Sequence, residues 1–370
     1  MKKQFYFLSL IALFFASCSS DDSSTENTDG QVNSPIEEAL VSPSLGGPNQ
    51  QNQVYIDLST NQQTAILRDS WDLGFSTGSD FRVIINGSIK MAVKQTTSTD
   101  ISEVQSEDAA VAVGYTTYST MGYVDNPTGI LQGTGEGEGT AIAAISSNNE
   151  ENKVYLVNLG YEVGTATPTV GSVSTDGDAR GWKKIRITKQ GDDYVLQYAN
   201  LDATTAQSVT ISKDSEYNFV FVSLNNGQTV NVQPKKNQWD LNFTGFTNYY
   251  PFGTSSITYY FSDFVSTNML GGTEVYEVLA TDATQTELEF ENFVLSNVDQ
   301  SKFTISLTDQ RIIGSSWRNG GGPSSLPSIK DDRFYILKDV EGNFYKLIFL
   351  ALTNDNGERG YPVFKYEILK

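Results

Sequence analysis

The reactive side chains of this sequence are unusually few, and this limits the chemistry it can perform. The 370 residues include no histidine and a single cysteine, Cys18. Without an imidazole, Ser-His-Asp triads, HExxH zinc sites and histidine-ligated haem are all excluded. With one cysteine, an intrachain disulfide, a CxxC redox pair and a cysteine-rich metal site are excluded as well.

Cys18 itself lies in a sequence context that favours lipidation. Lys2 and Lys3 precede an apolar run from Phe5 to Phe15, and Ala16-Ser17 lead into the cysteine. The run covers only about 17 Å as a helix, against a hydrocarbon layer of roughly 30 Å, so a permanent span is not expected. Residues 1–17 are therefore predicted to be a lipoprotein signal peptide, with an acyl anchor added at Cys18.

The segment after the cysteine is predicted to be a tether. Residues 18–48 are rich in Ser, Asn, Gly and acids and contain no Lys or Arg, so we expect a disordered, lipidated linker. Its Ser-Ser-Asp-Asp start is similar to the acidic signal that sends some Gram-negative lipoproteins to the outer face of the outer membrane. The expected location is therefore the outer membrane, lipid-anchored and exposed at the cell surface.

No group of residues indicates catalysis or a metal site. The net charge of −19 repels phosphate backbones, so nucleic acid is not an expected partner. The spacing of the glycine-rich stretch 133–139 matches neither the G-x-G-x-x-G motif nor the Walker motif of phosphate-binding loops. Asp176-Gly177-Asp178 supplies too few oxygen ligands for calcium. Two carboxylates could run glycoside hydrolysis, but no pair among the 44 acids is set apart by its context. We therefore expect a protein that is not an enzyme.

The elements that must position any site are strands. Val54, Ile56 and Leu58 alternate with polar residues, as do Ile185 and Ile187. Glycine- or asparagine-containing turns separate such runs. The sequence thus predicts an all-β protein with antiparallel sheets.

The strand pattern occurs twice, which predicts a duplication. The motif Trp71-Asp72-Leu73-Gly74-Phe75 recurs as Trp239-Asp240-Leu241-Asn242-Phe243, at an offset of 239 − 71 = 168. A second block recurs at 342 − 191 = 151, as Gly191 and Gly342 show. We place a first β domain at 49–212 and a second at 213–370. The groove between the two copies is a natural ligand site.

Individual motifs divide between packing and recognition. The alternation of Trp, Leu and Phe in the repeated motif favours core packing. Trp317 and Arg318 open a loop of three glycines that ends at Pro323 and occurs in the second copy alone. Such a loop is typical of a plain long turn, and recognition through Trp317 and Arg318 is the other interpretation.

These strands together resemble the HmuY family of haem-binding lipoproteins. The second copy carries the whole pattern: the Trp239 motif, Arg333–Lys338, Gly342–Phe349 and Val363–Tyr366. The first copy matches at its Trp71 motif and at its Gly191 hairpin, so the resemblance describes a tandem version of the family.

The resemblance implies a lipid-anchored, all-β protein that takes haem from haemoproteins and passes it to a TonB-dependent receptor. The family holds the iron with two axial side chains, His in some members and Met in others. This chain has no His, and residues 317–323, which match the region of one family ligand, contain neither His nor Met.

If iron is bound axially, methionine or tyrosine must hold it. Met121 and Met269 lie beside glycines and small residues typical of loops, so they are the candidate haem ligands, while Met91 lies in a strand-like run and is expected in the core. For each methionine the alternative is a gap-filling role in an apolar interior. The leading prediction is haem or porphyrin binding for uptake. The alternative is an adhesive or structural protein, or one that binds another ligand such as a glycan.

Overall fold

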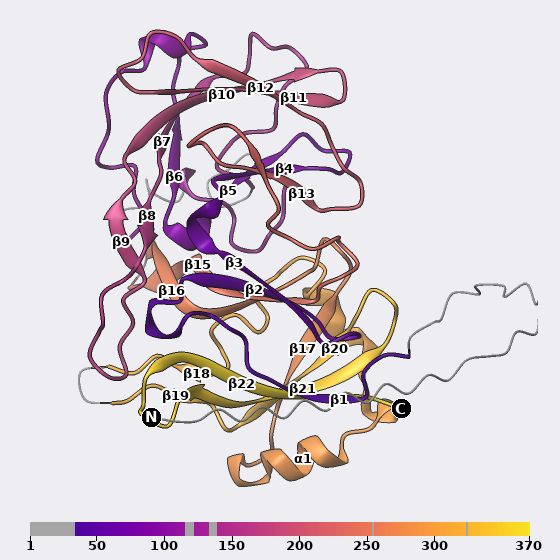
Figure 1. Cartoon of the computed structure of the whole chain (residues 1–370). Helices are drawn as coiled ribbons and strands as arrows, with labels where there is room; N and C mark the ends of the chain where they lie inside the picture. Colours follow the sequence, from indigo (N-terminus) through magenta and orange to yellow (C-terminus); the bar gives the residue numbers. More distant parts are fainter. Residues whose placement is uncertain (1–33, 115–121, 133–138, 254, 323–324) are drawn as a thin grey trace, which may run out of the picture. The chain divides into compact units, whose positions relative to one another are not determined.

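The computed structural model describes residues 34–114, 122–132, 139–253, 255–322 and 325–370. Every strand pair in this part of the chain is antiparallel, which confirms the predicted all-β class. Four sheets hold most of the strands (Figure 1). The first five-stranded sheet runs β12 (Gln207–Ile211), β11 (Asp193–Asn200), β10 (Trp182–Gln190), β7 (Val154–Asn158) and β6 (Ala92–Gln95). The second runs β1 (Glu38–Val41), β22 (Arg359–Ile368), β21 (Phe344–Thr353), β20 (Arg333–Lys338) and β17 (Glu274–Leu279).

Two four-stranded sheets complete the layers. One runs β14 (Thr229–Val230), β13 (Phe219–Val222), β4 (Leu73–Ser76) and β5 (Val83–Ile85). The other runs β16 (Ser255–Thr267), β15 (Leu241–Phe252), β2 (Asn52–Asp57) and β3 (Gln62–Leu67). Two-stranded ribbons join β8 (Tyr161–Val163) to β9 (Asp176–Ala179) and β18 (Arg318–Asn319) to β19 (Ser328–Ile329).

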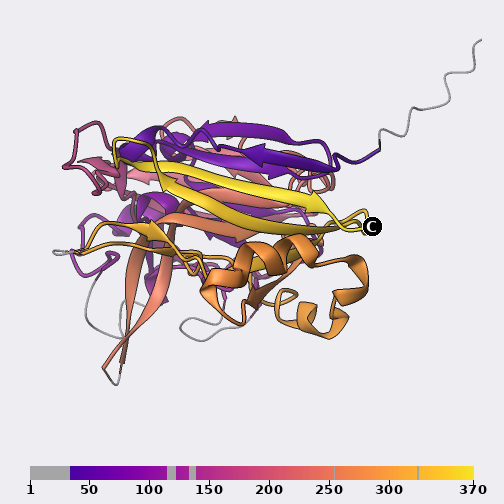
Figure 2. The same cartoon turned by 90° about the horizontal axis from the view of Figure 1, so that it is seen from below.

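Helical segments are short. The α-helix α1 (Thr286–Asn292) buries Phe290 against Phe334 of the second five-stranded sheet (Figure 2). Shorter helical turns include η1 (Gly47–Asn49), η2 (Arg68–Ser70), η3 (Gly87–Ile89), η4 (Ile101–Glu103), η6 (Ala283–Gln285), η7 (Leu295–Asn297) and η8 (Gln300–Ile305).

Each five-stranded sheet packs on one four-stranded sheet to form a two-layer unit. In the first unit, Leu73 and Phe75 of β4 meet Ile185 of β10 and Tyr194 of β11. In the second unit, Phe243 of β15 stacks on Phe364 of β22 at 5.4 Å. The apolar residues of the repeated motif thus lie in the two cores, as their alternation predicted, and Met91 is fully buried in the first core.

The two copies exchange their first hairpins, which the sequence did not reveal. The hairpin β2–β3 precedes the Trp71 motif, yet β2 pairs with β15, where Ile56 lies opposite Leu241. Reciprocally, β13 pairs with β4, where Val222 lies opposite Leu73 (Figure 1). The motif aspartates accept equivalent hydrogen bonds, from the Leu58 N–H to Asp240 at 2.9 Å and from the Leu224 N–H to Asp72 at 2.6 Å.

The exchange changes how the predicted domains are understood. Residues 49–212 and 213–370 remain the two copies along the sequence, but each core contains strands from both. Residues 35–370 accordingly form one compact unit. A linear boundary at 212/213 is therefore not a boundary between two separately packed bodies.

The predicted tether ends earlier than expected. Strand β1 (Glu38–Val41) pairs with β22, and Val41 and Leu45 are buried, so the later part of 18–48 is ordered. The open edge of β22 satisfies the backbone groups of β1, while the two apolar side chains join the second core. Cys18 and the predicted signal peptide 1–17 lie outside the described residues.

Candidate functional site

Two hollows lie between strands of the two copies, and residues from both copies line each of them. We name the larger one the tyrosine pocket, after Tyr250, Tyr259 and Tyr260 in its lining. We name the smaller one the dyad cavity, because Trp71 and Trp239, the equivalent residues of the two copies, both line it. The tyrosine pocket has a volume of about 870 Å³ and the dyad cavity one of about 160 Å³. Sites for drug-sized ligands typically occupy ~300–1,000 Å³, so of these two hollows the tyrosine pocket is the one large enough for such a ligand.

The long hairpin β15–β16 forms one wall of the tyrosine pocket. Asn86 and Asn268 each close the hairpin of their copy by donating to the carbonyl of the motif Trp, and 268 − 240 = 28 residues separate Asn268 from Asp240, against 86 − 72 = 14 in the first copy. The second copy thus extends its hairpin by 14 residues beyond the shared core. The pocket wall is this extension.

Aromatic side chains cover the extension. Tyr259 contacts Phe261 at 5.1 Å between ring centroids, and Tyr250 lies 6.1 Å from both rings. Tyr250 and Tyr259 are 49% and 51% exposed. Exposed tyrosines held by a strand pair provide flat, amphipathic contact area at low entropic cost.

A cluster of cations lies in the same pocket. Arg318, Arg359 and Lys90 line it, with Asp176 as the acid among the lining residues. Asp263 forms ion pairs with both arginines, and Lys90 pairs with Asp176. Three positive and two negative groups leave one net positive charge at this place, in a chain whose net charge is −19. The pocket therefore favours an anionic group.

The arginine cluster is held by a strained backbone position. Asp263 has a φ of 49°, in a β-bulge of β16 where the register shifts. Gln50 fixes its carboxylate by a 2.6 Å hydrogen bond from Nε2 and accepts the Asp263 N–H at 3.0 Å. Burial, opposed by the attraction of Asp263, lowers the pKa of Arg318. The Nε of Arg359 is buried and has no hydrogen-bond partner among the described residues. Strain of this kind is typical of functional sites, and an unpaired guanidinium donor favours an additional acceptor.

The structure separates the two predicted recognition residues. Trp317 is fully buried, stacks on Phe349 at 4.2 Å and donates from Nε1 to the Asp263 carbonyl at 3.2 Å. It is a core residue and does not line the pocket, so its interpretation as a ligand contact is corrected. Arg318, Gly320 and Gly321 do line the pocket, and recognition by this part of the loop stays a prediction.

The predicted haem ligands are not brought to the tyrosine pocket. Met269 lies in the wall of the dyad cavity together with Met91, and its sulfur approaches Gly129. A cavity of about 160 Å³ is too small for a porphyrin, since its volume is near that of a ~150 Å³ cavity that holds a single benzene. Met121 lies outside the described residues.

Sequence reasoning named Arg318 but missed the other charged and aromatic residues that line the tyrosine pocket. The pairs Tyr249-Tyr250 and Tyr259-Tyr260, on either side of a Gly253 turn, were the available signal for an aromatic hairpin. Lys90 and Arg359 carried no signal, because the fold alone brings them together. The described part of the chain contains neither a group of three acidic, His or Cys residues placed to hold a metal ion nor a helix long and apolar enough to span a membrane.

Two β units with hollows between them define a tandem β-sheet protein. A model of the family described as HmuY protein matches residues 49–195 and 215–366, more than half of the chain. The chain therefore belongs to the HmuY family, in a two-copy form, as the motifs predicted.

Three solved structures match about half of this chain. A protein described as a lipoprotein from Bacteroides fragilis has 14% identity and a TM-score of 0.23, over 49% of this chain and 92% of its own. An apo HmuY analog from Tannerella forsythia has 17% identity and a TM-score of 0.21, over 48% and 90%. Apo PinO from Porphyromonas gingivitis has 13% identity and a TM-score of 0.17, over 50% and 94%. A search of curated proteins finds no match.

Proposed function

We propose that this chain is a lipid-anchored surface protein that binds haem or a related porphyrin in the tyrosine pocket, without a catalytic step. The observation that carries the proposal is the meeting of exposed Tyr250 and Tyr259 with the cation cluster of Arg318, Arg359 and Lys90. A porphyrin is a flat apolar ring with carboxylates at one edge. The tyrosine hairpin offers the ring surface, and the cations offer partners for the carboxylates.

The described residues that line the pocket include neither His nor Met, so tyrosine is the side chain among them that can ligate haem iron. Tyr259 is the best placed, because it is half exposed and contacts the neighbouring aromatic rings. The protein would then hold the haem iron by one tyrosine oxygen and the haem carboxylates by the cations of the pocket.

The anchor and the partners extend this proposal to the cell. Acylation at Cys18 would hold the protein in outer-membrane lipid, with the following residues up to about 37 as tether. Haemoproteins would supply the ligand, and a TonB-dependent receptor would accept it. Family membership and the sequence around Cys18 support this arrangement.

The test is a titration of the chain lacking residues 1–21 with haem and, separately, with iron-free protoporphyrin. We expect a saturable Soret shift with haem. Tyr259→Phe should weaken haem binding about tenfold or more and affect protoporphyrin less, because it removes an iron ligand and keeps the ring. Lys90→Gln should weaken the binding of both haem and protoporphyrin, because it removes a positive charge from the pocket.

The control is Tyr361→Phe, which alters a similarly exposed tyrosine that does not line the pocket. Met269→Ala tests the earlier ligand prediction and should leave the Soret band unchanged. Absence of a saturable spectral change with either ligand would refute porphyrin binding and favour an adhesive role or another ligand.

A further inference from the structure

The dyad cavity is surrounded by residues that the duplication repeats. Trp71 and Trp239 both line it, and each receives a hydrogen bond at its carbonyl from an asparagine that also lines it, Asn86 at 2.9 Å and Asn268 at 2.8 Å. The exchanged hairpins close the cavity, since Phe221 packs edge-on against Trp71 at 4.7 Å and Tyr55 against Trp239 at 5.0 Å. The cavity therefore exists only because the two copies exchange hairpins.

The walls of this cavity contain polar atoms that no other group satisfies. Trp71 Nε1, Trp239 Nε1, Gln53 Nε2 and Asn242 Oδ1 are buried and have no hydrogen-bond partner within the described ranges. All four side chains belong to residues that are more than nine-tenths buried. Gln233 Oε1 is a fifth unpaired atom of the lining. Buried polar groups are almost always paired, so this group of unpaired atoms around one cavity indicates a ligand.

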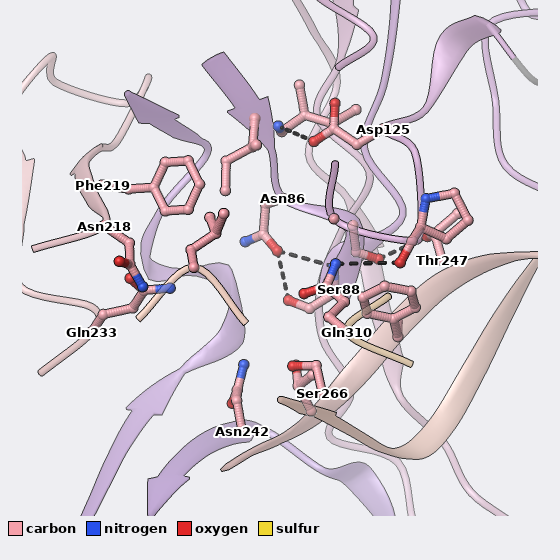
Figure 3. Close-up of a pocket in the computed structure, with 18 of the residues that line it drawn as sticks. Asn86, Ser88, Asp125, Asn218, Phe219, Gln233, Asn242, Thr247, Ser266 and Gln310 are labelled. Atoms are coloured by element: carbon pink, nitrogen blue, oxygen red, sulfur yellow. Dashed lines mark hydrogen bonds between the residues drawn. The ribbon is translucent and has the colours of Figure 1, made fainter. Parts of the chain in front are cut away.

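Further polar groups surround the same space. Figure 3 shows Asn86 and Ser88 on one side, Asn242 and Ser266 on the opposite side, and Gln233 nearby. The lining also contains amide and hydroxyl side chains between aromatic rings. This mixture can donate and accept hydrogen bonds while packing against an apolar face.

The charge of the lining selects a neutral ligand. Among the described residues, no Lys or Arg lines the cavity, and Asp125 is the acid there. Its carboxylate already accepts the N–H of Ile85 at 2.8 Å and of Ala141 at 2.9 Å. An anion would find no countercharge, and the acid is already engaged with the backbone.

The volume sets the size of the ligand. About 160 Å³ corresponds to one six-membered ring, by comparison with a ~150 Å³ apolar cavity that admits benzene. A polar wall makes a hydroxylated ring a better match than benzene, because each buried donor and acceptor needs a partner. We propose that the dyad cavity is a second binding site, which takes one neutral pyranose ring through Trp71, Trp239, Gln53 and Asn242.

The experiment uses the chain lacking residues 1–21, with D-glucose, D-galactose and D-mannose as probes and open-chain sorbitol as comparison. Tryptophan fluorescence and saturation-transfer NMR are recorded at up to about 50 mM sugar, enough to detect a Kd near 1 mM. We expect at least one hexose to bind saturably and sorbitol to bind at least about tenfold more weakly, because its chain is not pre-organised. Absence of binding by all three hexoses, or equal binding of sorbitol, would overturn the proposal.

Two variants locate the site. Asn242→Leu keeps the approximate side-chain size and removes the unpaired oxygen, so we expect hexose affinity to fall more than about tenfold while the melting temperature stays equal or rises. Trp239→Phe removes an indole N–H and should also weaken binding. The matched control, Trp182→Phe, changes a tryptophan outside the cavity and should leave the affinity unchanged.

Affinity that survives both cavity variants would overturn the assignment to this cavity. The haem titration is independent of these results, since no described residue lines both the tyrosine pocket and the dyad cavity.

Discussion

Replacing Asp240 by Asn should stabilise the protein at alkaline pH. Asp240 is buried at the start of β15, where its two oxygens accept the Leu58 N–H and the Thr273 hydroxyl, each at 2.9 Å. Among the described residues no cation pairs with it, and burial raises its pKa from 3.8 to about 7. The folded state therefore keeps a proton that the unfolded chain releases near pH 4.

The sign and size of the effect follow from proton linkage. Between pH 4 and 7 the folded state binds more protons, so the free energy of unfolding falls as the pH rises. At ~1.36 kcal/mol per pH unit the total loss by pH 8 is on the order of 4 kcal/mol. Asn can still accept the Leu58 N–H and donate to Thr273, and it carries no charge. Asp240→Asn should thus resemble the parent protein near pH 4 and exceed it at pH 8.

The assay is urea unfolding followed by tryptophan fluorescence at pH 5, 6.5 and 8. The equivalent aspartate of the first copy provides the matched control, because Asp72 pairs with buried Arg180 at 2.6 Å. Asp72→Asn leaves that arginine without its partner and should destabilise the protein by about 3–5 kcal/mol. An Asp240→Asn protein that is less stable than its parent at pH 8, or that loses stability with pH as steeply, would refute the reasoning.

Three further predictions concern the exchange and the backbone. Residues 34–212 and 213–370, produced separately, should each show no cooperative unfolding in urea, because each half lacks the hairpin that completes its core. A mixture of the two halves should unfold cooperatively. Cooperative unfolding of either half alone would contradict the exchange. Gly160→Ala should cost about 3 kcal/mol or more of unfolding free energy, since its Cβ would lie 1.9 Å from a carbonyl oxygen, whereas Gly191→Ala, with open space around it, should cost about 1 kcal/mol; equal losses in thermal melts would show that the clash relaxes. Asp125→Asn should lose one of two backbone N–H hydrogen bonds, because an amide can accept at one atom only, but it also removes the carboxyl whose pKa burial raises to about 7, so its stability relative to the parent should rise from pH 5 to pH 8; urea midpoints whose difference from the parent does not change with pH would contradict this.

The sequence by itself determined the fold class and the duplication. Alternation along strands reports which faces are buried, and the repeated Trp71 and Trp239 motifs mark equivalent positions because core packing constrains residue type. The same local information placed Met91 in the core and identified the HmuY family. The residues on either side of Cys18 predict its lipidation, and this stays a prediction.

The tertiary structure alone decided where the sites lie. Strand pairing depends on partners far apart in the chain, and the hairpins β2–β3 and β13–β14 could pair with either motif strand on local pattern alone. The tertiary structure places Lys90 and Arg359 in one pocket, buries Trp317 while leaving Arg318 at that pocket, and places Met269 at a cavity too small for a porphyrin. Long-range pairing, which leaves no mark in a single strand, determined both candidate sites.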